Sequence, residues 1–385
     1  HEDDALRGAD YVITTFRVGG IDSRVIDERT AVELGYIGQE TTGAGGFAMG
    51  LRSIPVLLAY VEQMKTLCPH AWLINFANPS GMMAEAVAKK GGWQRCVGIC
   101  DGPSGMITTI AETLQVDEKQ LQAEYFGLNH LGWIRSVKLG GQELIGQILA
   151  YLAQAEQVPG YDVHPQMAVS LGMLPNYYLK YYYQSREEYA LQNAARELRG
   201  EEVARMNHAF FAQVREARQK EDAEGLQQVY NRYLLDRGRA HWGGDEAELK
   251  VDEHTVRDAE LGYARLALNL IEALVGGEPR TLIVNIPNRG CVSGMQDDDV
   301  VEIAAHVSRD RVEGIPVGEI PIHCLGLMQT VKAYEQQTIE AAVEGSRAKA
   351  IHALTIHPLV ADYQGAAALV DAYRTRHGDY FPRLS

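Results

Sequence analysis

Cys100 and His130 are two residues whose side chains could together bind a metal ion. Cys100 ends the apolar segment Cys96–Cys100, and His130 lies in the segment Gly127–Trp133. A thiolate and an imidazole would leave coordination positions open for substrate oxygens and water, as in catalytic metal sites. However, a cysteine at the end of a strand is often a small buried apolar residue, and a single histidine is often structural. The spacing alone therefore leaves both interpretations open.

An asparagine-rich segment follows another apolar stretch of the chain. Asn75 and Asn78 lie where the apolar segment 71–76 is expected to end, just before Pro79. Open α/β sheets bind ligands at the carboxyl ends of their strands, and a residue that precedes proline is extended. We therefore expect Asn78 to lie at the rim of a ligand site, with a helix starting just after it.

A cluster of tyrosines lies between residues 174 and 183. At helical spacing, Tyr178 shares a face with Tyr181 and Tyr182, so most of these rings are expected to pack in the core or at an interface. One phenol could act as a base if a nearby cation lowered its pKa from about 10.

Arg24 and Arg289 are candidates for binding an anion. Arg24 lies on an expected helix with acidic neighbours, and Arg289 follows a strand that ends near Asn285. Each arginine could form only a surface ion pair, which is worth little. The alternative is a bidentate clamp on a phosphate group.

The overall composition narrows the possible functions. The 385 residues include 51 acidic and 36 basic ones, for a net charge of -15, which argues against binding to nucleic acid or to an anionic membrane surface. We also find no run of eighteen apolar residues, and so expect no membrane partner. Five cysteines, an odd number without a signal-peptide pattern, predict a cytoplasmic location.

The segment Gly43–Gly50 has the highest density of glycine. It lies just before an expected helix around 51–67, where free N–H groups could face a ligand. It is not a G-x-G-x-x-G motif, because no strand directly precedes it and no acidic residue follows about 20 positions later. We expect a flexible loop on the substrate side of the site, with a structural turn or a dinucleotide loop as alternatives.

Expected strands and helices alternate in the first third of the chain. Strands are expected over 11–16, 71–76 and 96–100, with helices over 1–10, 51–67 and 81–89. This alternation predicts an α/β fold with a Rossmann-like, doubly wound parallel sheet in residues 1–124. The sequence starts directly with elements typical of the middle of such a domain, so we expect that its first βαβ segment is absent from this sequence.

The rest of the chain has a different pattern. Strands around 124–139 and 282–286 are separated by long charged helical stretches at 186–236 and 252–275. This pattern predicts a mixed α+β domain over residues 125–385, in an arrangement like that of lactate and malate dehydrogenases. Since no flexible linker separates the two parts, we expect the site at their interface.

Taken together, six motifs resemble, in their order, those of the NAD- and manganese-dependent glycoside hydrolases of family four. Within that family the resemblance is closest to the 6-phospho-β-glucosidases, and it covers essentially the whole chain. The motifs are Thr15–Gly20, Gly38–Gly46, Asn75–Met82, Gly98–Pro103, Gly127–His130 and Pro175–Tyr182.

The resemblance implies a role for each candidate residue. It implies NAD and a divalent ion, manganese, as cofactors, a phosphorylated disaccharide or glucoside as substrate, and a homodimer or homotetramer. Residues 1–124 would then be the remainder of the NAD-binding domain. The implied roles are metal binding by Cys100 and His130, base catalysis by Tyr178, contact with the sugar near the nicotinamide by Asn78, substrate binding by Asn129, and phosphate binding by Arg24 and Arg289.

The implied chemistry needs no pair of carboxylates around the glycosidic bond, and this family is a known exception to the two-carboxylate mechanism. Hydride leaves C3 of the sugar for NAD, and the resulting ketone acidifies the proton on C2. The metal polarises the carbonyl, a base removes the C2 proton, and the aglycone leaves by elimination. Water then adds, and NADH returns the hydride.

Two departures from the family pattern keep alternatives open. The glycine-rich strand–turn–helix that binds the NAD pyrophosphate has no match in this sequence. Asp101 stands where the β-glucosidases commonly have Asn, so a 6-phospho-α-glucosidase is an alternative. Two further alternatives are an NAD-dependent hydroxy-acid dehydrogenase, because fold does not fix function, and a non-catalytic sugar-phosphate sensor.

Overall fold

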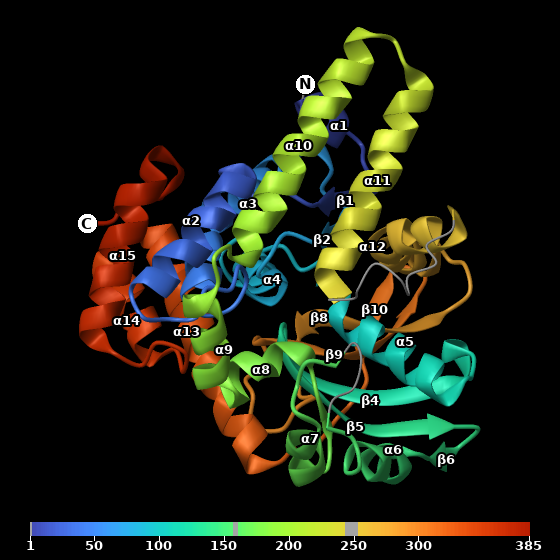
Figure 1. The fold of residues 1–385 in the computed structure, drawn as a ribbon. Coiled ribbons are helices and arrows are strands. Elements are labelled where there is room, and N and C mark those ends of the chain that lie inside the picture. The colour runs from blue at the N-terminus through green and yellow to red at the C-terminus, as the bar shows by residue number, and fades with distance from the viewer. Residues whose placement is uncertain (1, 157–160, 243–252) are drawn as a thin grey trace.

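A single mixed β-sheet runs through the molecule (Figure 1). The computed structural model describes residues 2–156, 161–242 and 253–385, with side chains described outside 238–263. Within these residues ten strands form the sheet, in the order β1-β2-β3-β8-β9-β4-β5-β6, with β10 paired to β9 and β7 paired to β5.

The first three strands are parallel, as the sequence predicts. They are β1 (Tyr11–Thr14), β2 (Trp72–Asn75) and β3 (Cys96–Gly98). In register, Thr14 lies beside Asn75 and Asn75 beside Gly98. The segments that follow these three residues therefore emerge side by side at one edge of the sheet, which we call the carboxyl edge.

The other strands continue the same sheet in antiparallel fashion. They are β4 (Leu121–Leu128), β5 (Leu131–Leu139), β6 (Gln142–Glu143), β7 (Leu174–Pro175), β8 (Arg280–Pro287), β9 (Val300–Ser308) and β10 (Arg311–Gly314). Strand β8 joins β3 antiparallel, where Gly98 pairs with Asn285. The α/β class and the parallel sheet are confirmed. The division at 124/125 stays a prediction, and it falls within β4, at a shift in register between Glu124 and Tyr125.

Helices from both ends of the chain pack beside one another. The N-terminal ones are α1 (Glu2–Leu6), α2 (Gly20–Glu33), α3 (Gly43–Leu67), α4 (Ser80–Lys89) and α5 (Gly102–Leu114), and the C-terminal ones are α13 (Ile322–Glu344), α14 (Arg347–Ile356) and α15 (Tyr363–His377). In Figure 1 the blue α2 and α3 lie against the red and orange α13–α15. Packing on α3 buries Phe47, Leu51 and Ile54 completely.

The expectation of a flexible loop at Gly43–Gly50 is wrong, because these residues form the buried first turns of α3. The preceding segment crosses directly over the glycines. A Cβ atom on Gly45 would lie 2.1 Å from the carbonyl oxygen of Gln39, and one on Gly46 would lie 2.5 Å from that of Thr41. By length and composition alone α3 could cross a membrane, but 72% of its most apolar window is buried in the protein, as in a core helix.

The middle of the chain is mainly helical. Its helices are α6 (Ile145–Leu152), α7 (Pro165–Leu171), α8 (Lys180–Tyr183), α9 (Ser185–Ala194), α10 (Arg199–Gln219), α11 (Ala223–Trp242) and α12 (Glu253–Leu274), with the short 3-10 helices η1 (Glu118–Gln120), η2 (Tyr177–Leu179) and, near the C-terminus, η3 (Gly378–Tyr380). Figure 1 shows α10 and α11 as an antiparallel pair that projects from the body. The Glu28 carboxylate on α2 accepts a hydrogen bond from the Gly200 N–H, 2.6 Å away, which holds the start of α10 against α2.

Candidate active site

The structure brings Cys100 and His130 together at the carboxyl edge. Cys100 follows β3, and His130 lies in the tight turn between β4 and β5 with a φ of 62°. The Cys100 Sγ and the His130 Nε2 are 3.4 Å apart. Both residues are buried, with 7% and 4% of their surfaces exposed. Two side chains 30 positions apart in the sequence therefore form one contact.

Burial sets the charge of both groups. It raises the pKa of the Cys100 thiol well above its ordinary value, and the nearby Glu302 and Asp101 carboxylates raise it further. Hydrogen bonds from the Gly102 backbone and the Asn129 side chain oppose that rise. Burial lowers the pKa of His130 to about 4, so its imidazole is neutral at pH 7 and can act as a metal ligand.

The pair fits a divalent metal ion. Sulfur and nitrogen ligands that share one ion at usual bond lengths of about 2.1–2.3 Å lie roughly 3–4 Å apart, and the observed separation of 3.4 Å falls in this range. No group of three or more His, Cys, Asp or Glu side chains suited to a metal occurs in the described part of the chain. Cys100 and His130 would thus leave positions open for other ligands.

Tyr178 stacks on His130, one member of this pair. The rings of Tyr178 and His130 are 3.9 Å apart between centroids, at an interplanar angle of 21°. Asn176 positions the start of η2 by accepting a hydrogen bond from the Tyr178 N–H at 3.1 Å. Burial raises the pKa of the Tyr178 phenol, and Tyr177, Cys100, Glu40 and Asp101 raise it further. These surroundings therefore disfavour the phenolate, and a cation is needed to reverse the effect.

Arg24 lies close to Tyr178, and its positive charge is held in a cluster of opposite charges. Its Nε donates to Glu28 at 2.7 Å, and its Nη1 lies 2.8 Å from Glu40, which also pairs with Arg17. The Arg24 side chain is only 11% exposed, so these are not surface ion pairs. Its Nη2 makes no hydrogen bond to the side chains that the structure describes and remains available to a ligand.

The two candidate asparagines differ in their surroundings. Asn78 follows β2 at the carboxyl edge, is partly exposed, and forms no side-chain hydrogen bond within the described residues. Its amide can therefore bind a ligand. Asn129 is buried, and its amide accepts from the Gly81 N–H at 3.4 Å and donates to Glu302 at 3.3 Å. Its polar atoms are thus directed at other parts of the protein.

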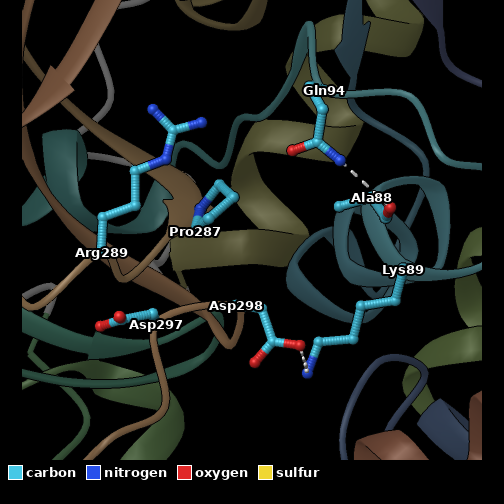
Figure 2. A pocket seen from close by; sticks show the side chains of 7 residues that line it. All are labelled: Ala88, Lys89, Gln94, Pro287, Arg289, Asp297 and Asp298. Atoms are coloured by element: carbon cyan, nitrogen blue, oxygen red, sulfur yellow. Dashed lines mark hydrogen bonds and ion pairs between the residues drawn. The ribbon is translucent and has the colours of Figure 1, made fainter.

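The structure does not bring Arg289 to the other candidates. Because β8 runs antiparallel to β3, the residues that follow β8 emerge at the opposite edge of the sheet from Cys100. There the exposed Arg289 lines a cavity of about 370 Å³ (Figure 2), together with Ala88, Lys89, Gln94, Pro287, Asp297 and Asp298. Lys89 is paired with Asp298 at 3.3 Å in this cavity.

Two carboxylates near Cys100, His130 and Tyr178 were not predicted as site residues from the sequence. They are Glu40 and Glu302. Glu40 joins Arg17 to Arg24, and its negative charge acts on His130 and Tyr178. Glu302 lies on β9 with 1% of its surface exposed, and burial raises its pKa to about 7. The only signal for Glu302 is a single acidic residue within the apolar run 300–305.

Comparison with known proteins supports the resemblance. The family model described as Family 4 glycosyl hydrolase matches residues 1–116, and the one described as Family 4 glycosyl hydrolase C-terminal domain matches residues 125–360. A probable 6-phospho-β-glucosidase of Bacillus subtilis is 31% identical over 389 residues, which cover 99% of this chain and 81% of that protein. The 6-phospho-β-glucosidase of Escherichia coli is 30% identical, with coverage of 99% and 81%.

Solved structures of 6-phospho-glucosidases are also similar to this chain. The 6-phospho-β-glucosidase of Thermotoga maritima, solved with manganese, NAD+ and glucose-6-phosphate, is 28% identical, with a TM-score of 0.81 and coverage of 100% of this chain and 84% of that one. A 6-phospho-α-glucosidase from gut microorganisms, solved with NAD and Mn2+, is 27% identical, with a TM-score of 0.80 and the same coverage. This chain therefore belongs to the family 4 glycosyl hydrolases.

Proposed function

We propose that this chain hydrolyses 6-phospho-β-glucosides with NAD and manganese as cofactors. One observation carries the proposal: Cys100, His130 and Tyr178, drawn from three separate segments, meet at the carboxyl edge of the sheet. Membership of the family and the 6-phospho-β-glucosidase names of its relatives support the substrate class. Structures of relatives with NAD, manganese and glucose-6-phosphate support the cofactors and the phosphorylated sugar.

Each residue has one task in this proposal. Cys100 and His130 hold the ion, Asn78 binds the sugar hydroxyls near the nicotinamide, and the Nη2 of Arg24 donates to the 6-phosphate. Tyr178 removes the proton from C2 of the sugar, after which the aglycone leaves. When bound, NAD would accept and return a hydride, and the metal ion would polarise a carbonyl of the sugar. Arg289 has no task here, because it lies at the opposite edge of the sheet.

A second candidate within the family is a 6-phospho-α-glucosidase. Asp101 supports it, since this residue lies directly after Cys100 with its Oδ1 3.9 Å from the sulfur. Other similar proteins carry α-specific names, among them a phospho-α-glucosidase of Clostridium acetobutylicum that is 28% identical. The relatives that are 31% and 30% identical carry β-specific names, and for this reason we favour the β-anomer.

We further infer a cytoplasmic enzyme with two domains, residues 1–124 and 125–385. The absence of disulfides among its five cysteines fits a reducing compartment. The change from parallel to antiparallel pairing supports two structural parts. A homodimer or homotetramer is proposed from the resemblance alone, and size-exclusion chromatography with light scattering measures it.

The decisive assay offers the protein aryl 6-phospho-β-glucosides and aryl 6-phospho-α-glucosides with NAD and manganese. We expect release of the aryl group from the β-anomer without net formation of NADH, because the hydride is returned. Faster turnover of the α-anomer would favour the second candidate. Net NADH production from a small hydroxy acid would indicate a dehydrogenase, and binding of glucose-6-phosphate without turnover of either glucoside would indicate a sensor.

A further inference from the structure

Glu302 is a buried carboxylate directly behind the candidate site, and its hydrogen-bond donors among the described residues are neutral. Its Oε2 accepts from the Tyr125 hydroxyl at 2.8 Å, and its Oε1 accepts from Asn285 at 2.9 Å and from Asn129 at 3.3 Å. No lysine or arginine of the described residues forms an ion pair with it. Buried carboxylates are normally paired with a cation because their desolvation is costly, so this arrangement calls for an explanation.

Two chains of hydrogen bonds start at Glu302, and we call them its two arms. The first arm leads to the candidate base, Tyr178. The Tyr125 hydroxyl donates to Glu302 and accepts from the Asn176 amide at 3.3 Å. The Asn176 Oδ1 in turn accepts from the Tyr178 N–H at 3.1 Å. Asn176 is completely buried, so its orientation depends on these partners. Glu302 therefore fixes, through two intermediates, the backbone position from which the Tyr178 ring extends.

The second arm runs from Glu302 to the metal-binding pair. Asn129 donates to Glu302, directly precedes His130 in the turn, and also hydrogen-bonds the Cys100 sulfur. Its Oδ1 accepts from Gly81 at the start of α4, close to Asn78. The third donor, Asn285, joins Glu302 to the carbonyl of Gly98, two residues before Cys100.

We propose that Glu302 is a positioning residue whose carboxylate holds the base Tyr178 and the metal-binding pair Cys100 and His130 in one fixed arrangement. The proposal rests on the proposed function. Glu302 is the acceptor in all three of these hydrogen bonds, so its two oxygens fix the direction of the donors in both arms. An amide in its place would point N–H groups at a donor in one of the arms.

Charge supports the same assignment. The Glu302 carboxylate is 1% exposed and accepts hydrogen bonds from neutral groups at both of its oxygens. A divalent cation held by Cys100 and His130 would supply the positive charge that the described side chains do not offer to Glu302. Partners of this kind, one step behind the ligands of a metal, commonly change metal affinity or activity by about 10–100-fold when they are substituted.

The test uses variants that separate the two arms. In Glu302→Gln the amide N–H groups oppose a donor in one arm, and the negative charge that accepts from both arms is lost. Mn2+ binding to the protein without NAD or sugar should therefore weaken by about 10–100-fold, and kcat should fall by a similar factor. Tyr125→Phe interrupts only the first arm, so kcat should fall while Mn2+ affinity is unchanged. Electron paramagnetic resonance of free Mn2+ gives the affinity independently of turnover.

Glu335→Gln is the matched control. Glu335 is also buried, and its pKa is also raised to about 7, but its carboxylate is paired with Lys332 on the same helix, α13. We expect this variant to keep the Mn2+ affinity and kcat of the wild type. Equal losses in Glu302→Gln and Glu335→Gln would show a general effect of a neutralised buried carboxylate and would overturn the proposal.

Glu302→Asp keeps an acceptor-only group and should recover part of the Mn2+ affinity that Glu302→Gln loses. Wild-type affinity in a folded Glu302→Gln protein would also overturn the proposal. If Glu302→Gln does not fold, two other variants test the proposal. Tyr125→Phe should lower only kcat, and Asn129→Ser should weaken Mn2+ binding. A wild-type protein that binds Mn2+ more tightly than Glu302→Gln, but hydrolyses no phosphoglucoside, would contradict the proposed function and leave this inference standing.

Discussion

The imidazole ring of His130 lies nearly parallel to the phenol ring of Tyr178, with their centroids 3.9 Å apart. The first ring extends from the turn between β4 and β5, and the second from η2, so the stack joins two segments 48 residues apart in the sequence. A displacement of either segment moves both a candidate metal ligand and the candidate base. Both functions therefore depend on the same local packing.

Substitution of Tyr178 by Phe tests the base. The Tyr178 hydroxyl forms no hydrogen bond to the residues that the structure describes, so Tyr178→Phe should keep the ring stack and the melting temperature. If the phenol removes the C2 proton, kcat should fall by about 10²–10⁴-fold, the usual contribution of a general base. Steady-state kinetics on an aryl 6-phospho-β-glucoside measures this fall.

Tyr181→Phe is the control for that experiment, because the Tyr181 ring is 6.3 Å from Tyr178 and does not stack on His130. Its kcat should stay at the wild-type level. Hydrolysis by the wild type in heavy water should also place deuterium at C2 of the product, provided the base exchanges its proton with solvent. Full activity of Tyr178→Phe would transfer the role to another group.

Substitutions of Arg24 and Arg289 by lysine form a matched pair that tests which arginine binds the phosphate. Arg24→Lys keeps the charge but loses the planar donor array, so kcat/KM for a 6-phosphoglucoside should fall by roughly tenfold or more, as expected for the loss of a hydrogen bond to a charged group. Arg289→Lys should leave kcat/KM unchanged, because Arg289 lies at the opposite edge of the sheet. The reverse ranking of the two variants would place the phosphate at the Arg289 cavity instead.

Substitution of Gly45 by Ala tests the close contact between helix α3 and the backbone that precedes Glu40. A methyl group at Gly45 would meet the Gln39 carbonyl oxygen at 2.1 Å, so the backbone just before Glu40 must move. We expect Gly45→Ala to lower the free energy of unfolding by about 1–3 kcal/mol, as for other overpacked sites, with a loss of activity. Urea unfolding provides the measurement.

Gly105→Ala is the comparison for Gly45→Ala. Gly105 lies in helix α5, and a methyl group there meets no atom within 4 Å. The substitution should raise stability by roughly 0.5–1 kcal/mol, because glycine disfavours a helix relative to alanine. Similar destabilisation by both substitutions would show that contact with Gln39 is not the cause.

The stability of the protein should depend on pH through His357. Burial lowers the pKa of this imidazole to about 3, whereas a histidine in the unfolded chain has a pKa of about 6.5. Between these values the unfolded state binds more protons than the folded state, so stability is lost as the pH falls below about 6.5. One such group contributes a slope of about 1.4 kcal/mol per pH unit.

His357→Asn should remove that contribution, because an amide does not titrate and its oxygen can still accept from the Leu359 N–H as the His357 Nδ1 does at 3.0 Å. Urea unfolding between pH 4 and 6 should therefore give a flatter profile for this variant. His352→Asn is the control at an exposed histidine, and its profile should match the wild type. An unchanged slope in His357→Asn would contradict the assignment.

Much of the fold and part of the site could be predicted from the sequence. The strands around residues 11–16, 71–76 and 96–100 are short apolar runs, and their parallel order follows from their alternation with helices. Because parallel strands end at the same edge, the positions of Asn78 and Cys100 at that edge follow directly from local patterns. The motifs around Cys100, His130 and Tyr178 also indicated the family.

Other features depend on contacts between segments that are distant in the sequence. The direction of β8 relative to β3 places Arg289 at the edge opposite to Cys100, and no local pattern near Arg289 reports that direction. The glycines at 43–50 form a helix because the backbone of 39–41 packs against them. The donors that surround Glu302 come from two segments of the chain, Tyr125 and Asn129 from β4 and the turn after it, and Asn285 from β8.

The sequence by itself determined the first three strands, most of the helices between them and the kinds of side chain that follow these strands, because hydrophobic periodicity is a local property. Only the tertiary structure decided which of these side chains meet and what charge they carry. Strand direction, close backbone contacts and desolvation arise when distant segments pack together. For this reason the contact of Cys100 with His130, the isolation of Arg289 and the raised pKa of Tyr178 became visible only in the folded chain.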